Sequence, residues 1–204
     1  MGRLDEKKKQ KKDTLFTAAF DLFTSQGFNK TSISDIVKQA GVAKGTFYLY
    51  FKDKYDVKNK LIAHQAHSLF DQAVTALDET TLTDFSDIII FLVDYIINQL
   101  EENRKLLRFI AKDLSWGLFK SALLSNDEHM DTDFYDRYLT LAKDCNVTMS
   151  NPEILLFMII ELVGSSCYNC ILYNTPLSMK EYKPYLYQCI RSMINTQIES
   201  TSLT

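Results

Sequence analysis

Apolar residues recur three and four positions apart along most of the chain, and this spacing predicts amphipathic α-helices. Near the N-terminus, Phe16, Ala19, Phe20 and Phe23 form such a stripe on a helix that we expect over Asp5–Gln26. Six Gly and three Pro in 204 residues leave few positions that would break a helix. Hydrophobic residues make up 46% of the chain and give the helices apolar faces to bury. We therefore predict an all-α fold.

The next group of apolar positions predicts two short helices joined by a tight turn. Ser32 is placed to cap the first helix, and Asp35 three residues later completes a capping box. Gly41 ends that helix, where a left-handed residue is needed and glycine adopts this conformation without a steric penalty. On the second helix, Phe47 and Phe51 are four residues apart, so we expect both to point into the core.

The outward face of the second helix carries side chains that suit a binding surface better than a solvated one. Lys44, Gly45, Tyr48 and Leu49 share this face. Exposed aromatic and aliphatic side chains suit thymine methyl groups and sugars, and lysines suit phosphates. The lysines in or beside this helix are Lys44, Lys52, Lys54, Lys58 and Lys60. The pattern indicates a helix-turn-helix, whose second helix enters a DNA major groove.

Residues 27–54, with the sequence GFNKTSISDIVKQAGVAKGTFYLYFKDK, resemble the DNA-binding domain of the TetR (AcrR-type) family of bacterial transcriptional regulators. The resemblance implies an all-helical homodimer of two-domain chains with about nine helices each. The small N-terminal domain of this family, a three-helix unit, binds operator DNA, and the larger C-terminal domain dimerises and often binds an effector. We therefore expect a DNA-binding domain over residues 1–52 and a second domain over residues 53–204, with a connecting helix over residues 53–78.

The resemblance and the outward face together assign the DNA contacts. The second helix is expected to read bases through Lys44, Gly45, Thr46, Tyr48 and Leu49. Ser32 and Ser34 are expected to contact DNA from the first helix, and Tyr50 and Lys54 to hold phosphates. One position departs from the family pattern, because Ala43 stands where a serine or threonine usually caps the second helix. The loss of such a cap costs roughly 1 kcal/mol.

The formal net charge of −3 is unevenly distributed. Residues 1–60 contain 13 Lys and Arg against 7 Asp and Glu, which gives +6, whereas residues 61–204 contain 10 against 19, which gives −9. A basic segment on an acidic protein is expected to face nucleic acid. The lysines at the start of the first helix are either a solvated tail or a basic arm that contacts DNA. They are Lys7, Lys8, Lys9, Lys11 and Lys12.

Beyond residue 78 the pattern predicts five helices separated by polar or proline-containing breaks. They are Thr83–Glu102, Arg104–Leu124, Asp131–Cys145, Pro152–Tyr173 and Ser178–Glu199. The fourth is apolar almost all round, so it is either a buried core helix or part of an interface between subunits. We favour an interface in which the last two helices pair with their copies as a four-helix bundle. Its expected residues are Leu156, Ile160, Gly164, Tyr168, Tyr185, Cys189 and Met193.

Aromatic residues are abundant in the middle helices, which suits an apolar effector pocket, although such residues more often form an ordinary core. The pocket is expected beside the helix that connects the two domains. Its expected lining residues are His67, Phe70, Phe91, Tyr95, Phe109 and Trp116. An effector that tilts the connecting helix would change the separation of the two recognition helices in a dimer.

No constellation of residues indicates catalysis, a metal site or a cofactor. Cys167 and Cys170 have CxxC spacing, but they lie within an apolar helix and not at a helix N-terminus that would lower a thiol pKa. Four cysteines without a disulfide framework suit a reducing cytoplasm. The apolar runs Asp87–Tyr95 and Ile154–Ile160 are shorter than a membrane span of about 20 residues. The charged N-terminus does not read as a secretory signal.

We therefore expect a cytoplasmic, non-enzymatic regulator that binds a palindromic, double-stranded operator as a homodimer. Its expected action is repression, with release from DNA by a small, mostly apolar effector, and without a membrane partner. The alternative is a TetR-like interaction module that acts through a protein partner and binds DNA weakly or not at all. An enzyme is a third alternative, against which the lack of a catalytic constellation argues.

Overall fold

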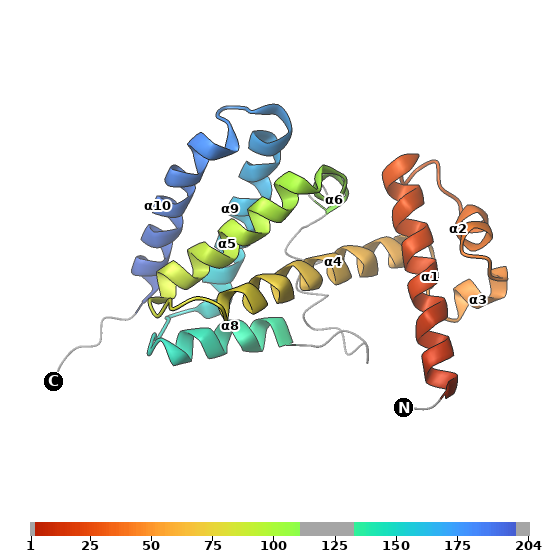
Figure 1. Ribbon diagram of the computed structural model, residues 1–204, viewed down its shortest axis with the longest axis horizontal. Helices are drawn as coiled ribbons and strands as arrows, with labels where there is room; N and C mark the ends of the chain where they lie inside the picture. The colour runs from red at the N-terminus through yellow and green to blue at the C-terminus, as the bar shows by residue number, and fades with distance from the viewer. Residues whose placement is uncertain (1–2, 111–132, 199–204) are drawn as a thin grey trace. The chain divides into compact units, whose positions relative to one another are not determined.

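The computed structural model describes residues 3–110 and 133–198, and these residues form helices without any β-strand (Figure 1). An isolated antiparallel bridge pairs Met149 with Ile198. The helices of the described residues are α1 (Arg3–Ser25), α2 (Ile33–Gln39), α3 (Lys44–Tyr48), α4 (Lys54–Leu77), α5 (Phe85–Glu102), α6 (Arg104–Ile110), α8 (Asp133–Asp144), α9 (Pro152–Tyr173) and α10 (Met179–Gln197). The all-α prediction is confirmed, and the helix bounds agree with the predicted ones to within two residues wherever both ends are described.

The chain divides into two compact units, residues 1–65 and residues 66–204. The sequence placed the boundary at residues 52 and 53, in the loop before the connecting helix. The division of the structure falls within α4, which is continuous from Lys54 to Leu77. The first half of α4 therefore belongs to the N-terminal unit and the second half to the C-terminal unit.

The N-terminal unit has an apolar core to which α1 contributes one stripe. Leu15, Ala19 and Phe23 are buried on this stripe, whereas Phe16 and Phe20 are only half-buried. Ala19 and Phe23 are buried as predicted, but Leu15 takes the interior position that was expected for Phe16. The rings of Phe16 and Phe20 lie at the edge of the core. The other helices complete the core with Ile36, Val37, Phe47, Phe51, Val57 and Leu61.

Local hydrogen bonds explain where α2 begins and ends. Asp35 N donates to Ser32 Oγ at 3.2 Å, and Ser32 N donates to Asp35 Oδ2 at 2.9 Å, which confirms the predicted capping box. Hydrogen bonds from the Ser32 side chain and backbone hold the pKa of Asp35 below its usual value. At the other end, Gly41 has a φ of +66° and Val42 N bonds to Val37 O at 3.0 Å, as in a Schellman motif.

The C-terminal unit packs the second half of α4 against α5, with α8 beside them. A buried cluster joins these helices through Phe70, Ala73, Val74, Leu77, Ile88 and Leu92, and α8 adds the partly buried Leu141 and Cys145. On the other side of α5, α6 and α9 pack against it, and α10 lies alongside both α5 and α9 (Figure 1). This arrangement surrounds α5 with apolar neighbours, which explains its many buried residues.

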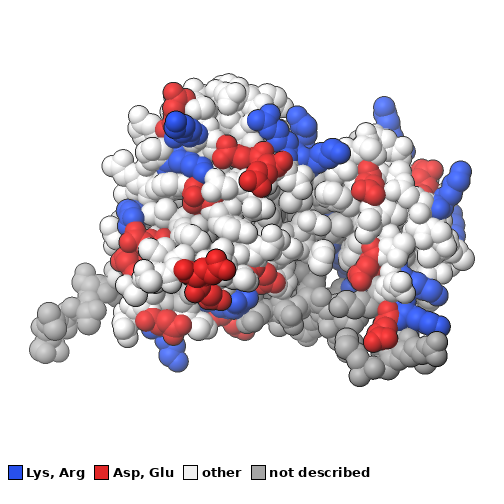
Figure 2. Space-filling model, viewed as in Figure 1, with Lys and Arg blue, Asp and Glu red and all other residues white. Residues whose placement is uncertain are grey.

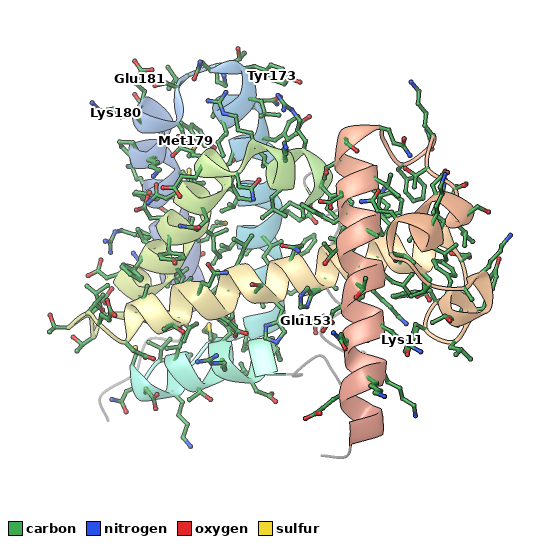
Figure 3. The ribbon with its side chains drawn as sticks, turned by 45° about the vertical axis from the view of Figure 1, so that its right-hand side comes forward. Lys11, Glu153, Tyr173, Met179, Lys180 and Glu181 are labelled. Carbon is green, nitrogen blue, oxygen red and sulfur yellow. The ribbon has the colours of Figure 1, made fainter. Side chains whose placement is uncertain are left out.

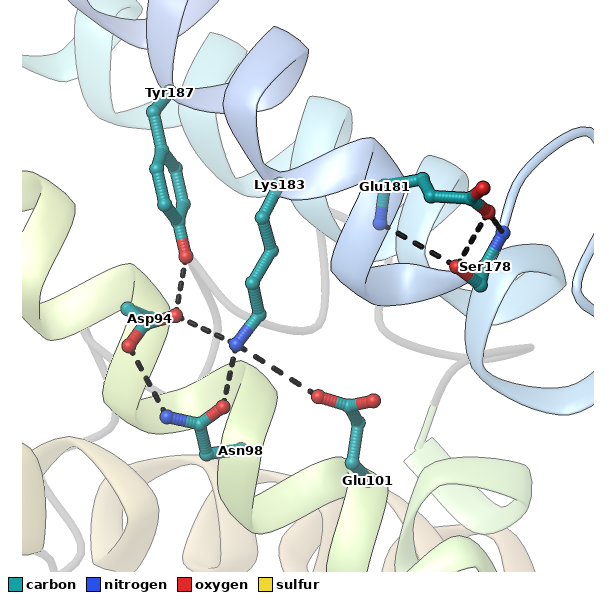
Figure 4. Close-up of polar contacts among 7 residues, drawn as sticks. All are labelled: Asp94, Asn98, Glu101, Ser178, Glu181, Lys183 and Tyr187. Carbon is teal, nitrogen blue, oxygen red and sulfur yellow. Dashed lines mark hydrogen bonds and ion pairs between the residues drawn. The ribbon is translucent and has the colours of Figure 1, made fainter.

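A row of polar side chains joins α5 to α10 (Figure 4). Lys183 Nζ lies 2.7 Å from Asp94 Oδ1 and 3.7 Å from Glu101 Oε2, and the Tyr187 hydroxyl donates to Asp94. Burial opposes the ionisation of Asp94, but the bonds from Lys183 and Tyr187 outweigh it and lower the pKa of this carboxyl. Arg191 continues the row with an ion pair to α5. We term this row the α5–α10 ladder; it fixes α10 in register on α5.

Helix α9 is long and apolar enough to cross a membrane, with a mean hydropathy of 1.8. The apolar runs considered in the sequence were shorter because Glu161 and a group of small residues interrupt them. Core helices of water-soluble proteins have the same composition, and α9 packs against α5, α6 and α10. However, only 33% of its apolar window is buried within the chain. The other residues of this apolar window are half-buried or exposed.

Candidate DNA-binding surface and interior cavity

Helix α3 presents its predicted outward face to solvent. Leu49 is 78% exposed and Tyr48 is 53% exposed, although Phe47 beside them is fully buried. Lys44 and Gly45 are also exposed, and Thr46 is half-buried. Phe47 thus anchors α3 in the core, and the opposite side offers an aliphatic and an aromatic side chain to a partner.

The N-terminus of α3 has no side-chain cap, as the alanine at position 43 predicted. Thr46 N bonds to Ala43 O at 2.9 Å, which closes the first turn. Earlier N–H groups of a first helical turn have no partner within the helix and commonly bind a phosphate or another anion. The start of α3 therefore has backbone donors in place of the hydroxyl that the family pattern provides.

Gly45 occupies a position at which the fold itself does not require glycine. Its backbone is helical, and a Cβ added to it would meet no atom within 4 Å. Gly41 differs, because its positive φ strains any other L-residue. A bare backbone at Gly45 therefore leaves room for something outside the chain to approach α3.

The surface around α2 and α3 is predominantly basic. Lys30, Lys38, Lys44 and Lys52 are all exposed, and the only acidic residue between positions 30 and 52 is Asp35, which belongs to the capping box. Figure 2 shows basic side chains at the right-hand edge of the molecule, with acidic side chains among them. This distribution follows the charge asymmetry of the sequence.

The remaining residues predicted to contact DNA differ in their exposure and in the hydrogen bonds that they already make. Ser34 is exposed, whereas the Ser32 hydroxyl donates to Asp35 Oδ2 at 2.6 Å. Tyr50 is half-buried, and its carbonyl accepts from Lys60 Nζ at 3.4 Å. Lys54, which was expected to hold a phosphate, donates two hydrogen bonds to backbone carbonyls of the N-terminal unit. The sequence contained no signal for these carbonyl contacts, because they join residues more than 20 positions apart.

The C-terminal unit contains a partly open cavity of about 150 Å³. Residues of α4, α5, α6, α8 and α9 surround it. The lining residues are Ala66, Leu69, Phe70, Ile89, Leu92, Val93, Ile96, Leu100, Leu107, Ile110, Tyr138, Leu141, Leu156, Ile159, Ile160, Val163, Gly164 and Cys167. None of these described residues is Asp, Glu, Lys, Arg or His, so the described lining is mostly apolar and has no charged side chain.

The two polar groups in this lining, the Tyr138 hydroxyl and the Cys167 thiol, do not offer a charge to a ligand. The Tyr138 hydroxyl has partners in Met149 Sδ at 3.2 Å and Pro152 O at 3.3 Å. Burial raises the pKa of Tyr138 above its ordinary value and raises that of the Cys167 thiol to about 12. Both groups are therefore neutral, and the cavity is suited to a neutral hydrocarbon group.

Only part of the predicted effector site lines this cavity. Phe70 is among the lining residues, whereas Phe91 and Tyr95 pack against the α4–α5 cluster on another side of α5. Phe109 is buried outside the lining, and Trp116 lies outside the described residues. The residues of α5 that line the cavity were not identified in the sequence analysis. They are spaced as one helical stripe, which could have indicated them: Ile89, Leu92, Val93, Ile96 and Leu100.

His67, also predicted to bind the effector, faces charged neighbours and not the cavity. Its Nδ1 lies 3.0 Å from Asp71 Oδ2 but is not aligned for a hydrogen bond. Arg137 of α8 bonds to Asp71 Oδ1 at 3.1 Å. His67 therefore belongs to a polar contact between α4 and α8.

The predicted dimer residues fall on different sides of their helices. Leu156, Ile160 and Gly164 line the interior cavity of the same chain. On α10, Tyr185 and Cys189 are exposed and Met193 is half-buried, and Tyr168 of α9 is also half-buried. Another stripe of α9 contains the exposed Ile154, Ser165 and Asn169 together with the half-buried Met158 and Leu162. Tyr173 and Glu181 lie at the same end of the α9–α10 pair in Figure 3, and Glu153 lies at the opposite end of α9.

Comparison with known proteins places the helix-turn-helix in a defined family. Residues 15–59 match the model of the bacterial regulatory proteins of the tetR family. Over 150 residues, the chain is 30% identical to YvdT of Bacillus subtilis (strain 168), an uncharacterized HTH-type transcriptional regulator, with coverage of 71% of this chain and 70% of YvdT.

Solved structures share the fold over nearly the whole chain. The fatty acid degradation regulator FadR of Bacillus halodurans superposes with a TM-score of 0.61 and 22% identity, over 87% of this chain and 96% of that one. FadR of Bacillus subtilis in complex with stearoyl-CoA gives a TM-score of 0.60 with 17% identity, over 88% of this chain and 97% of that one. The sequence matches and the shared architecture agree, and the chain belongs to the TetR family of DNA-binding transcriptional regulators.

Proposed function

We propose that this regulator is a repressor that binds a palindromic operator as a homodimer and is released by a small, mostly apolar effector. The observation that carries the DNA contact is the exposure of Leu49 and Tyr48 on a helix anchored by the buried Phe47. Apolar and aromatic groups at this position suit thymine methyl groups and sugars in a major groove. The residues proposed to read the bases are Lys44, Gly45, Thr46, Tyr48 and Leu49, and the further proposed contacts are Ser32, Ser34, Tyr50 and Lys54.

Dimerisation through α9 and α10 is supported by the apolar surface that the subunit leaves uncovered. Ile154 of α9 is 46% exposed and Tyr185 of α10 is 61% exposed, and contiguous exposed apolar surface marks interaction sites. The proposed interface consists of the outward stripe of α9 together with Tyr185, Cys189 and Met193 of α10. Two-fold pairing of this face would place two α3 helices on one palindrome.

The effector proposal is supported by the lining of the cavity. A cavity of 150 Å³ lined by aliphatic and aromatic side chains can hold a group of about the size of benzene. That volume is below the range of roughly 300 Å³ or more that is typical of whole-ligand pockets. The cavity thus suits the hydrocarbon part of a larger molecule. The stearoyl-CoA in the structure of B. subtilis FadR, a protein with the same fold, makes acyl chains the first class to test.

The DNA proposal is tested by selecting bound fragments from a random duplex pool with the purified full-length protein. We expect an enriched inverted repeat whose affinity falls with salt, because lysines displace counterions from phosphates. Repression is then tested with a reporter gene placed behind the enriched site, where the protein is expected to lower expression. Failure to enrich any sequence would contradict the DNA proposal, and activation of the reporter would contradict repression.

The effector proposal is tested by measuring the affinity for this DNA with and without acyl-CoA thioesters and uncharged hydrocarbons. We expect Val93→Phe to abolish release, because the added ring occupies the cavity, while DNA binding without effector is retained. Ile90→Phe is the matched control, since Ile90 lies on the same helix but does not line the cavity. Release that survives Val93→Phe as well as Ile90→Phe would exclude this cavity as the effector site.

A further inference from the structure

Tyr138 of α8 links the wall of the cavity to the start of α9. It is among the lining residues and is 2% exposed. Its hydroxyl lies 3.3 Å from Pro152 O and 3.2 Å from Met149 Sδ, and both atoms are acceptors. A hydroxyl has one hydrogen to donate, and a thioether sulfur is the weaker of these two acceptors. Pro152 is the first residue of α9, so the Tyr138 hydroxyl is bonded to the point at which α9 begins.

The start of α9 is joined in turn to the end of α10. Met149 forms the isolated antiparallel bridge with Ile198, and Ser150 N donates to Gln197 O at 3.0 Å. The Ser150 hydroxyl donates to the carbonyl and to the side-chain Oε1 of Gln197, at 3.3 Å and 3.1 Å. We term residues 149–152 and 197–198 the α9–α10 junction. Tyr138 is therefore bonded to a segment that holds together the two helices of the proposed dimer interface.

The residue beside Tyr138 attaches α8 to α4. Arg137 donates to Asp71 Oδ1 of α4 at 3.1 Å. The Tyr138 ring also approaches Phe85 of α5, with the ring centroids 6.1 Å apart. Adjacent residues of α8 thus contact α4 and the start of α9, and both of these helices contribute to the wall of the cavity.

The position of the Tyr138 ring makes its hydroxyl sensitive to what the cavity holds. A side chain that borders a cavity lacks van der Waals contacts on that side. A hydrocarbon group bound in the cavity would supply these contacts and restrict the ring, and the hydroxyl moves with the ring. The distance of 3.3 Å to Pro152 O exceeds the about 2.7–2.8 Å that is usual for a hydroxyl donor, so this bond has room to shorten. Occupation of the cavity therefore favours the state in which the hydroxyl is held on Pro152 O.

We propose that Tyr138 is the positioning residue through which a ligand in the cavity acts on the α9–α10 junction, and thereby on the dimer helices. This inference rests on the proposed effector cavity and names the residue that couples it to the rest of the regulator. Coupling requires an element with two states whose equilibrium the ligand changes. Here the element is the bond from the Tyr138 hydroxyl to the start of α9, which is either loose or held.

The test measures hydrogen exchange of the full-length protein with and without benzene, a probe whose size suits a cavity of this volume. In the wild type we expect benzene to slow exchange at residues 149–155, 197 and 198 by about threefold or more, because the junction opens less often. Tyr138→Phe keeps the ring and removes only the hydroxyl. In this variant benzene should still bind, as a rise in Tm would show, but these amides should exchange at the same rate with and without it.

Two variants serve as controls. Tyr95→Phe removes a hydroxyl from a tyrosine of the same unit that does not line the cavity, and it should keep the wild-type response. In Val93→Phe the added ring occupies the cavity, so benzene should change neither Tm nor exchange. If the Tyr138 hydroxyl only stabilised the fold, its loss would speed exchange equally with and without benzene, and the ratio of the two rates would remain that of the wild type.

Operator binding supplies a second readout. Coupled sites typically change each other's affinity by about 5- to 150-fold. For an acyl-CoA that releases the wild-type protein, we expect the affinities of Tyr138→Phe with and without operator to agree within about twofold. The inference would be overturned by junction amides that are not slowed in the wild type, by failure of benzene to bind the wild type, or by a wild-type response in Tyr138→Phe. If no acyl-CoA releases the wild-type protein, that part of the proposed function fails, and the benzene experiment still decides the role of Tyr138.

Discussion

Replacing Gly45 by Ala should raise the stability of the protein and lower its affinity for DNA. Gly45 lies within α3, and a Cβ there meets nothing in the chain within 4 Å. Glycine costs up to about 1 kcal/mol relative to alanine in a helix interior, and somewhat less near the end of a short helix. We therefore expect a gain of about 0.5–1 kcal/mol, which corresponds to a rise in Tm of roughly 1–4 °C for a chain of this size.

The matched control is Gly41→Ala, which lies four residues earlier in the turn between α2 and α3. A Cβ at Gly41 also meets nothing within 4 Å, but φ is +66°. Alanine in this left-handed conformation costs about 1–2 kcal/mol, so Tm should fall. Thermal unfolding followed by circular dichroism should therefore move in opposite directions for the two glycine-to-alanine variants.

The effect of Gly45→Ala on DNA binding has a separate cause. A methyl group on the exposed face of α3 holds the backbone away from the groove, and disruption of one good interaction with a base costs about 1–3 kcal/mol. Operator affinity measured by fluorescence anisotropy should thus fall by about 5- to 150-fold, although the protein is more stable. An unchanged affinity would refute the placement of Gly45 against DNA, and a lower Tm would refute the claim that the fold does not need this glycine.

Three further predictions concern other parts of the chain. Ala43→Ser should restore the missing cap of α3 and raise the free energy of unfolding by roughly 1 kcal/mol, as measured in urea. Lys183→Met should destabilise the protein most at neutral pH, because Lys183 lowers the pKa of Asp94 below its usual value of 3.8. The ionised Asp94 stabilises the folded state at pH values above 3.8, and this stabilisation is lost as the pH falls through the lowered pKa. The Tm difference from wild type should therefore shrink in acid, and it should correspond to less than about 1 kcal/mol because the pair is partly exposed. Tyr185→Glu should convert a sedimenting dimer to a monomer with a folded N-terminal unit, and a wild-type protein that sediments as a monomer would contradict the proposed interface.

The helix ends and the turn of the N-terminal unit depend on residues close together in the sequence, and for this reason they could be predicted. The capping box of Ser32, the left-handed Gly41 and the uncapped start of α3 each depend on contacts within about five positions. The inward direction of Phe47 and the outward direction of Leu49 follow from helical spacing alone. The fold class likewise follows from periodicity and from the scarcity of glycine and proline.

The sequence could not decide which apolar stripe of a helix faces which neighbour. Helix α9 is apolar on most sides, so its spacing did not distinguish the stripe of Leu156, Ile160 and Gly164, which lines the cavity, from the stripe of Ile154 and Leu162, which is less buried. The expected effector residues differ in part from the lining of the cavity for the same reason, because large aromatic residues were preferred over the aliphatic stripe of α5. Burial depends on all the packed helices at once, and periodicity describes only one of them.

Contacts between distant segments depend on tertiary structure in the same way. A lysine beside a recognition helix reads in the sequence as a phosphate ligand, and only the folded chain brings Lys54 to the carbonyls of Phe28 and Thr31. The α5–α10 ladder joins residues about 90 positions apart. Sequence by itself thus determined the family, the helices and the outward face of α3, because these are local properties. The folded structure decided the partners of each charge and the walls of the cavity, because these depend on which segments the fold brings together.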